Sequence, residues 1–157
     1  MKIGLSGTGR MGTAMGLHLM DNKHKLAVWN RTSRKTRELV KAGATACKTP
    51  ATVVNESDLI LNIVIDDKAA KAVYEGKDGI LSGDLKGKLV IEISTLMPET
   101  TKALEKKIKA KGGAFLECPV GGSVAPARSG NLIGMAGGTP ATFKRAKPVL
   151  ETLCRRV

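Results

Sequence analysis

Short apolar runs alternate with amphipathic stretches along nearly the whole chain. The runs have the length of strands and lie at 3–5, 25–30, 44–47, 58–65, 88–93, 115–118 and 133–136. Between them apolar residues recur at helical spacing, as in Met11, Met15 and Leu19. The run at 58–65 is almost continuously apolar, which is typical of a strand covered on both faces of a parallel sheet. The pattern predicts an α/β fold with a doubly wound parallel sheet.

Capping and turn signals separate these elements. Thr49-Pro50 and Thr139-Pro140 are typical of helix starts, with threonine as the N-cap and proline at the first helical position. Loops rich in turn-forming or small residues are predicted at 76–87 and 119–126. Because no repeat or internal linker interrupts the alternation, we expect a single domain over 1–157.

The composition is that of an ordinary globular domain. Hydrophobic residues make up 42% and charged residues 25% of 157 positions, and no apolar run approaches the roughly 18 residues of a membrane span. The N-terminus leads straight into a strand, which is unlike a signal peptide. Cys47, Cys118 and Cys154 are widely spaced and form no C-x-x-C pair. This spacing favours buried, reduced thiols and a cytoplasmic setting.

The net charge of +12 raises the question of a polyanionic partner. Acidic residues are interspersed among the basic ones, and aromatic residues are only 3% of the chain, too few for a platform on which bases could stack. The lysines between 102 and 111 surround Leu104 and Ile108, as on the solvated side of an amphipathic helix. We therefore predict neither a nucleic-acid nor a membrane partner.

The strongest chemical signal stands at the start of the chain, where Gly7-x-Gly9-x-x-Gly12 follows the first apolar run and precedes a helical pattern. In this context the spacing is typical of a Rossmann dinucleotide site. The first glycine permits a tight turn, the second a close approach of a pyrophosphate, and the third close packing of helix on strand. Free N–H groups at the helix start would bind the phosphates. The alternative is a glycine-rich turn that binds nothing.

The end of the second predicted strand bears on which coenzyme would bind. In NAD-specific sites an acidic residue about 20 positions after the glycines holds the ribose 2′-hydroxyl. Here that position holds Asn30, and Arg31, Thr32, Ser33, Arg34 and Lys35 follow. Amide, hydroxyl and guanidinium groups would bind a 2′-phosphate that a carboxylate would repel, so we predict NADP rather than NAD. The alternatives are that Arg34 and Lys35 are solvated residues at a helix start and that Thr32 is a simple N-cap.

Asp66 and Asp67 follow the long apolar run at the end of a predicted strand, where ligands bind in open α/β sheets. A metal role is conceivable for such a pair, but no further ligands cluster nearby. We interpret the pair as the N-terminal cap of a helix over 68–74 and predict no metal site.

At this point the chain resembles the β-hydroxyacid dehydrogenase family, which includes 3-hydroxyisobutyrate dehydrogenase, tartronate semialdehyde reductase and glyoxylate/succinic semialdehyde reductase, with 6-phosphogluconate dehydrogenase as a more distant relative. The likeness rests on four stretches, at 4–12, 28–32, 93–100 and 115–138. Imine reductases share the first half, notably Trp29-Asn-Arg-Thr32, but fit the stretch after Pro119 poorly.

The resemblance implies roles for the matching positions. The coenzyme would contact two groups of residues, which are Gly7, Thr8, Gly9, Arg10, Met11 and Gly12, and Asn30, Arg31, Thr32 and Lys35. Val64 and Ile65 would lie beside the nicotinamide half, where the family usually has Leu-Pro, and Thr95 would also approach the coenzyme. Gly121, Gly122 and Ser123 would bind the carboxylate of a small substrate, although the family usually has serine where Gly121 stands.

Family members continue into an all-helical second domain, which carries the lysine that acts as general acid/base. No lysine of these 157 residues matches that motif, so no catalytic residue is predicted here. The resemblance thus implies the coenzyme domain of an oxidoreductase that is homo-oligomeric at full length. We expect the chain alone to bind dinucleotide, to be inactive or nearly so, and to self-associate. The alternatives are a non-catalytic dinucleotide-binding module and an imine-reductase-like enzyme.

Overall fold

A computed structural model describes all residues, 1–157. Its main sheet has six parallel strands in the order β3-β2-β1-β4-β5-β6. The strands are β1 (Lys2–Ser6), β2 (Lys25–Trp29), β3 (Thr45–Ala46), β4 (Leu59–Asn62), β5 (Leu89–Glu92) and β6 (Ala114–Glu117). From β1 the chain first moves outward to β2 and β3, and it then returns to place β4 on the other side of β1. The strand order thus reverses between β1 and β4, and α/β sheets of this kind bind ligands at the carboxyl ends of the strands beside such a reversal.

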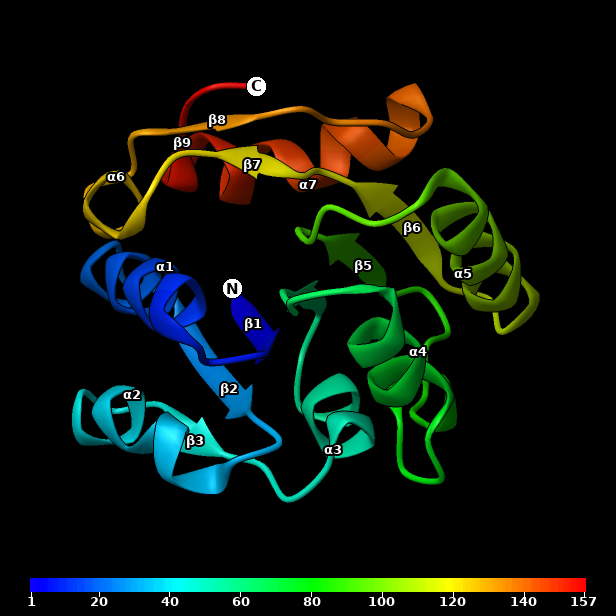
Figure 1. Cartoon of the computed structure of the whole chain (residues 1–157), viewed down its shortest axis with the longest axis horizontal. Helices are drawn as coiled ribbons and strands as arrows, with labels where there is room; N and C mark the ends of the chain where they lie inside the picture. Colours follow the sequence, from blue (N-terminus) through cyan, green and yellow to red (C-terminus); the bar gives the residue numbers. More distant parts are fainter.

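Helices cover both faces of this sheet, as the doubly wound pattern predicts (Figure 1). They are α1 (Arg10–Asp21), α2 (Arg37–Lys41), α3 (Pro50–Asn55), α4 (Asp67–Glu75), α5 (Pro98–Ala110), α6 (Val124–Arg128) and α7 (Pro140–Leu153), with short 3-10 turns η1 (Ser33–Thr36) and η2 (Ile80–Ser82). One core joins the sheet to α1, α2, α6 and α7, and a second joins it to α3, α4 and α5. Alternate residues of β4 face the two cores: Leu59 and Leu61 face the first, and Ile60 faces the second.

The last third of the chain differs from the expectation of one continuous sheet. The strand expected at 133–136 is β8 (Leu132–Gly134), and it belongs to a separate three-stranded sheet with β7 (Val120–Gly121) and β9 (Cys154–Arg156). This small sheet and α7 lie across the top of Figure 1, and α6 packs on α1. The predicted loop at 119–126 therefore contains the short elements β7 and the start of α6.

Several local signals have the predicted geometry. The Asp66 carboxylate accepts a hydrogen bond from the Ala69 N–H (2.8 Å), so it caps α4. Thr49 caps α3 through the Thr52 N–H (3.1 Å), and Thr139 caps α7 in the same way. Thr32 stands at the N-cap position of η1, but its side chain makes no capping hydrogen bond. No group of three or more His, Cys, Asp or Glu side chains could hold a metal ion, and no helix is long and apolar enough to cross a membrane.

Candidate dinucleotide site

The glycine turn between β1 and α1 gives each of its three glycines a different environment. Gly7 has φ +96°, and a Cβ there would stand 1.9 Å from the Ile63 carbonyl oxygen. A Cβ on Gly12 would stand 2.0 Å from the carbonyl oxygen of Gly7, so a side chain would separate α1 from the turn. A Cβ on Gly9, by contrast, would meet nothing within 4 Å. The turn is therefore closed against the protein at Gly7 and Gly12 and open at Gly9, as a cradle for a phosphate group requires.

Helix α1 begins directly beyond this open position. Gly9 is its N-cap, no side chain caps it, and its first turn carries no acidic residue. The first helical hydrogen bond runs from the Thr13 N–H to the Gly9 carbonyl (2.8 Å). The N–H groups of Arg10, Met11 and Gly12 precede that bond, so they have no partner within the helix. Together with the helix dipole, they suit an anion such as a pyrophosphate.

Thr8 ties the glycine turn to the loop that follows β2. Its N–H donates to Oδ1 of Asn30 (2.9 Å), and its hydroxyl donates to the backbone carbonyl of Lys35 (2.9 Å). Nδ2 of Asn30 in turn donates to the Thr32 carbonyl (3.1 Å). The sequence predicted that Thr8 and Asn30 belong to one site, and the structure brings them into direct contact.

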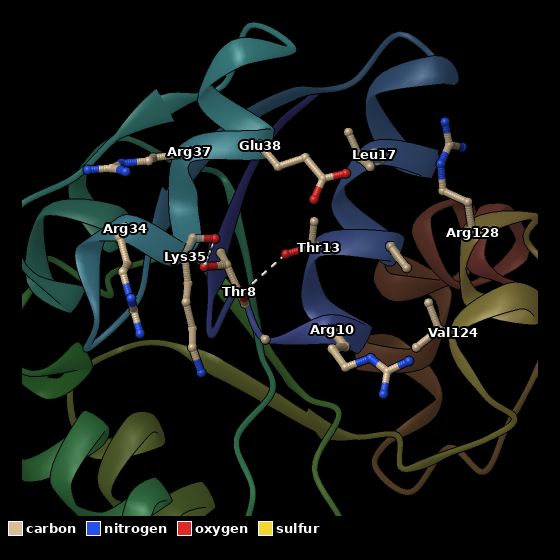
Figure 2. Close-up of a pocket in the computed structure, with 12 residues that line it drawn as sticks. Thr8, Arg10, Thr13, Leu17, Arg34, Lys35, Arg37, Glu38, Val124 and Arg128 are labelled. Carbon is tan, nitrogen blue, oxygen red and sulfur yellow. Dashed lines mark hydrogen bonds between the residues drawn. The ribbon is translucent and has the colours of Figure 1, made fainter.

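A groove of about 680 Å³ begins at this turn and runs along α1 (Figure 2). Its lining comes from the turn and α1, from η1 and α2, and from α6: Thr8, Gly9, Arg10, Thr13, Ala14, Leu17, Arg34, Lys35, Arg37, Glu38, Val124 and Arg128. Five of these side chains are cationic and one is a carboxylate. In Figure 2 the side chains of Arg10, Arg34 and Lys35 extend toward the same side of the groove. The groove thus presents positive charge beside the open position of the turn.

Sequence reasoning identified only part of this lining. It placed Thr8, Gly9, Arg10 and Lys35 in the site. It named Arg34 in the loop after β2 but not among the coenzyme contacts, and it did not predict Val124 and Arg128 of α6. The positions 10, 13, 14 and 17 follow helical spacing, so the sequence already places these residues on one side of α1. Arg31 is exposed and does not line the groove.

The carboxyl ends of β4 and β5 form the second part of the candidate site. The Val64 N–H donates to the Ser94 hydroxyl (2.8 Å), which fixes these two strand ends to one another. Ile65 is 90% exposed, and Thr95 is also exposed. The strand predicted at 58–65 ends at Asn62, because the chain turns away there toward the cap of α4. Val64, Ile65 and Thr95 therefore lie in loops at the ligand-binding edge of the sheet.

A buried carboxylate supports these two loops. Glu92 accepts hydrogen bonds from Asn62 Nδ2, the Tyr74 hydroxyl and the Ser94 N–H, each at 2.8 Å. Burial raises the pKa of Glu92, and the hydrogen bonds it accepts oppose that shift. The pKa of Tyr74 is raised well above its ordinary value by burial and by the nearby Glu92 charge.

The segment predicted to bind a substrate carboxylate is exposed. Gly121 is the last residue of β7, and Gly122 follows it with φ +135°. Ser123 is the N-cap residue of α6, and its side chain makes no capping hydrogen bond. The Ser123 hydroxyl is thus not used within the protein as a cap. The groove along α1 reaches this segment only at Val124.

Comparison with known proteins agrees with this geometry. The family model of the NAD-binding domain of 6-phosphogluconate dehydrogenase matches residues 2–157. The chain belongs to this family. The expected relationship to β-hydroxyacid dehydrogenases and the expected Rossmann-like fold are thereby confirmed.

Within the family, the chain is 40% identical over 156 residues to glyoxylate/succinic semialdehyde reductase 1 of Arabidopsis thaliana, covering 99% of this chain and 54% of that protein. It is 38% identical over 152 residues to the cytokine-like nuclear factor N-PAC of Danio rerio, covering 97% of this chain and 33% of that protein. The structure of Psf3 in complex with NADP+ and 2-OPP superposes with a TM-score of 0.92 at 28% identity, covering 99% of this chain and 56% of that one. The chain therefore spans about half, or less, of the length of these relatives.

Proposed function

We propose that this NAD(P)-binding domain binds NADP(H) in preference to NAD(H). The observation that carries the proposal is the end of β2, where Asn30 takes the place of a carboxylate and the cationic side chains of Arg34 and Lys35 stand beside the glycine turn. A carboxylate at that position would bind a ribose diol and repel a 2′-phosphate, whereas guanidinium and ammonium groups attract one.

Three groups of residues would contact three different parts of the coenzyme. The N–H groups of Arg10, Met11 and Gly12 would bind the pyrophosphate over the open position of Gly9. Arg31, Thr32 and Lys35 of the loop after β2, together with Arg34 of the same loop, would bind the 2′-phosphate. Val64, Ile65 and Thr95 would then lie along the nicotinamide half at the edge of β4 and β5.

Calorimetric titration of the 157-residue chain with NADPH and with NADH tests this proposal. A 2′-phosphate that gains two charge-assisted contacts should tighten binding by roughly tenfold to a hundredfold. The Arg34→Ala/Lys35→Ala variant should bring the two affinities within a few-fold of each other. Equal affinities in the wild-type chain, or binding of neither coenzyme, would contradict the proposal.

For the protein that carries this domain, we propose hydride transfer between the nicotinamide and a small β-hydroxyacid or semialdehyde. The 40% identity to a protein named glyoxylate/succinic semialdehyde reductase supports this substrate class. The exposed segment Gly121, Gly122 and Ser123 would bind the substrate carboxylate through N–H groups and the Ser123 hydroxyl. The nicotinamide supplies or accepts the hydride when bound, and no residue of this chain is assigned the proton transfer.

Turnover of 3-hydroxyisobutyrate, glyoxylate and succinic semialdehyde by the full-length protein with NADP(H) checks this reaction. The Ser123→Ala variant should raise KM more than it lowers kcat, because a carboxylate contact binds ground state and transition state alike. The 157-residue chain is expected to bind coenzyme and to give no turnover above background.

A non-catalytic dinucleotide-binding module is the second candidate function. It is favoured by the 38% identity to N-PAC, a protein named as a nuclear factor. Two departures from the family's usual residues also favour this candidate. Ile65, which is exposed, replaces a proline, and Gly121 replaces a serine, so a substrate would be held by fewer contacts. Coenzyme binding by the full-length protein without turnover of any of the three substrates would favour this candidate. An imine-reductase-like activity would require turnover of a cyclic imine instead.

A further inference from the structure

Every hydrogen-bonding group of Thr8 is engaged inside the protein. The residue is 2% exposed. Its N–H is bound to Asn30 and its hydroxyl to the Lys35 carbonyl, and its own carbonyl accepts from the Thr13 hydroxyl (3.1 Å). Although Thr8 stands in the centre of the glycine turn, both of its hydrogen-bond donors, the N–H and the hydroxyl, are already used. A direct bond from Thr8 to a coenzyme phosphate would therefore require one of these bonds to break.

The partners of Thr8 are spaced along the loop between β2 and α2. Asn30 begins this loop, and Lys35 lies in the η1 turn five positions later. Asn30 also closes the loop on itself by donating to the Thr32 carbonyl. The bonds of Thr8 thus hold both ends of the segment that carries Arg31, Arg34 and Lys35.

The geometry links two places that would each bind a phosphate. On one side of Thr8 are the open Gly9 and the free N–H groups of α1, and on the other side are the side chains of Arg34 and Lys35. In Figure 2 the Lys35 side chain passes beside Thr8, and its amine points to the same side as the Arg34 guanidinium. The Thr8 hydroxyl bonds to the Lys35 backbone and not to its amine, so it fixes where that side chain starts and leaves the charge free.

We propose that Thr8 is a positioning residue for coenzyme selectivity, which sets the distance between the pyrophosphate cradle and the cationic loop without contacting the coenzyme. The inference rests on the proposed NADP(H) preference. NADPH must satisfy both places at once, whereas NADH has no 2′-phosphate for the cationic loop. Loosening the loop therefore weakens NADPH binding and leaves NADH binding nearly unchanged.

The test compares Thr8→Val with Thr8→Ser by titration with both coenzymes. Valine has nearly the same shape and removes only the hydroxyl bond to Lys35. We expect the Kd for NADPH to rise roughly fivefold to tenfold and the Kd for NADH to change less than twofold. Serine keeps the hydroxyl and should stay within about twofold of the wild type for both. Thr8→Ala, which removes the same bond with a smaller side chain, should repeat the valine result.

Two further variants separate positioning from a general loss of structure. Thr101 of α5 is also buried and also donates its hydroxyl to a backbone carbonyl, that of Met97, on the opposite face of the sheet. Thr101→Val is the matched control and should leave both affinities unchanged. In the Arg34→Ala/Lys35→Ala background, Thr8→Val should raise the NADPH Kd less than twofold, because the two groove-lining cationic side chains of the loop are gone.

The outcomes distinguish this inference from the proposed function. If the wild-type chain does not prefer NADPH, the proposed function fails first. If it prefers NADPH but Thr8→Val and Thr8→Ala weaken both coenzymes equally, or neither, the positioning role is wrong while the preference stands. An undiminished effect of Thr8→Val in the Arg34→Ala/Lys35→Ala background would also overturn it, since Thr8 would then act directly on the coenzyme.

Discussion

At the residue scale, Gly9 and Gly12 of the same turn are predicted to matter for different properties, Gly9 for coenzyme binding alone and Gly12 for folding as well. Gly9→Ala adds a methyl group where nothing lies within 4 Å, so we expect stability to change by less than about 0.5 kcal/mol. The same methyl occupies the approach of the pyrophosphate and should weaken both coenzymes about tenfold or more. Denaturant unfolding and titration measure the two effects.

Gly12→Ala is the matched comparison within the same motif. Its methyl group would stand 2.0 Å from the Gly7 carbonyl oxygen, so α1 must move away from the turn. We expect a loss of about 1–3 kcal/mol of folding free energy, together with loss of coenzyme binding. Equal stability of the Gly9→Ala and Gly12→Ala chains would contradict the assigned roles.

Asn30→Asp tests the charge at the end of β2. The aspartate can still accept from the Thr8 N–H, but it loses the bond from Asn30 Nδ2 to the Thr32 carbonyl. Its negative charge would repel a 2′-phosphate and accept from a ribose hydroxyl. We expect NADPH binding to weaken at least tenfold while NADH binding holds or improves, as measured by titration. A parallel loss of both affinities would show that Asn30 acts only on the fold of the loop.

The sequence predicted these residues because glycine spacing and the charge after a strand are local features. It did not predict the Thr8 hydroxyl bond to Lys35, because a threonine hydroxyl has no preferred partner until the fold places one beside it. It also listed Arg31 and not Arg34 among the coenzyme contacts, whereas in the structure Arg34 lines the groove and Arg31 does not.

At the scale of the elements, Glu92 joins β5 to β4 and α4 through Asn62, Tyr74 and Ser94. Burial raises the pKa of Glu92 in the folded state. The unfolded chain then releases the Glu92 proton at a lower pH than the folded chain does. The Glu92 contribution to stability is therefore fully present below the ordinary glutamate pKa of about 4.3 and is lost as the pH rises through the folded pKa.

Glu92→Gln makes this contribution measurable. The glutamine amide cannot titrate, and its NH2 group must face at least one of the three hydrogen-bond donors that surround the Glu92 carboxylate. At low pH we therefore expect the Glu92→Gln chain to be less stable than the wild type by about 1–3 kcal/mol. The difference should narrow as the pH rises, because only the wild type loses stability over this range. Urea unfolding at several pH values checks the prediction, and parallel stability curves for the two chains would contradict it.

Elements with strong periodicity were predicted well, whereas three of the short ones, β7, α6 and β9, were missed. The long parallel strands are covered on both faces, so their apolar runs stand out in the sequence. By contrast, β7 and β9 have two and three residues and α6 has five, built partly from glycine, proline and exposed charges. The strands β7 and β9 form because they pair with β8, and α6 forms because it packs on α1. These contacts join residues that are distant in the sequence, so a local pattern does not predict them.

At the scale of the whole molecule, the ligand-binding edge of the sheet leaves large apolar side chains uncovered. Ile65 is 90% exposed and Met97 is 61% exposed, and the Met97 N–H bonds to Asp67, which places the two loops side by side. Met135, directly after β8 of the small sheet, is 59% exposed. Exposed apolar groups of this size favour association, while the net charge of +12 opposes it by repulsion between copies.

We therefore expect the 157-residue chain to self-associate reversibly and to do so more strongly at high salt, where the repulsion is screened. Met97→Glu/Met135→Glu lowers the net positive charge and so weakens the repulsion, yet it should raise the dissociation constant about tenfold or more if apolar contact drives association. Val40→Glu places the same group on α2, where Val40 is 40% exposed, and serves as the control with little effect. Light scattering over a range of protein and salt concentrations measures these differences.

A monomer at every concentration would show that the exposed apolar groups are too scattered to form an interface. Stronger association of the double glutamate variant would instead show that charge repulsion, and not apolar contact, controls the oligomeric state.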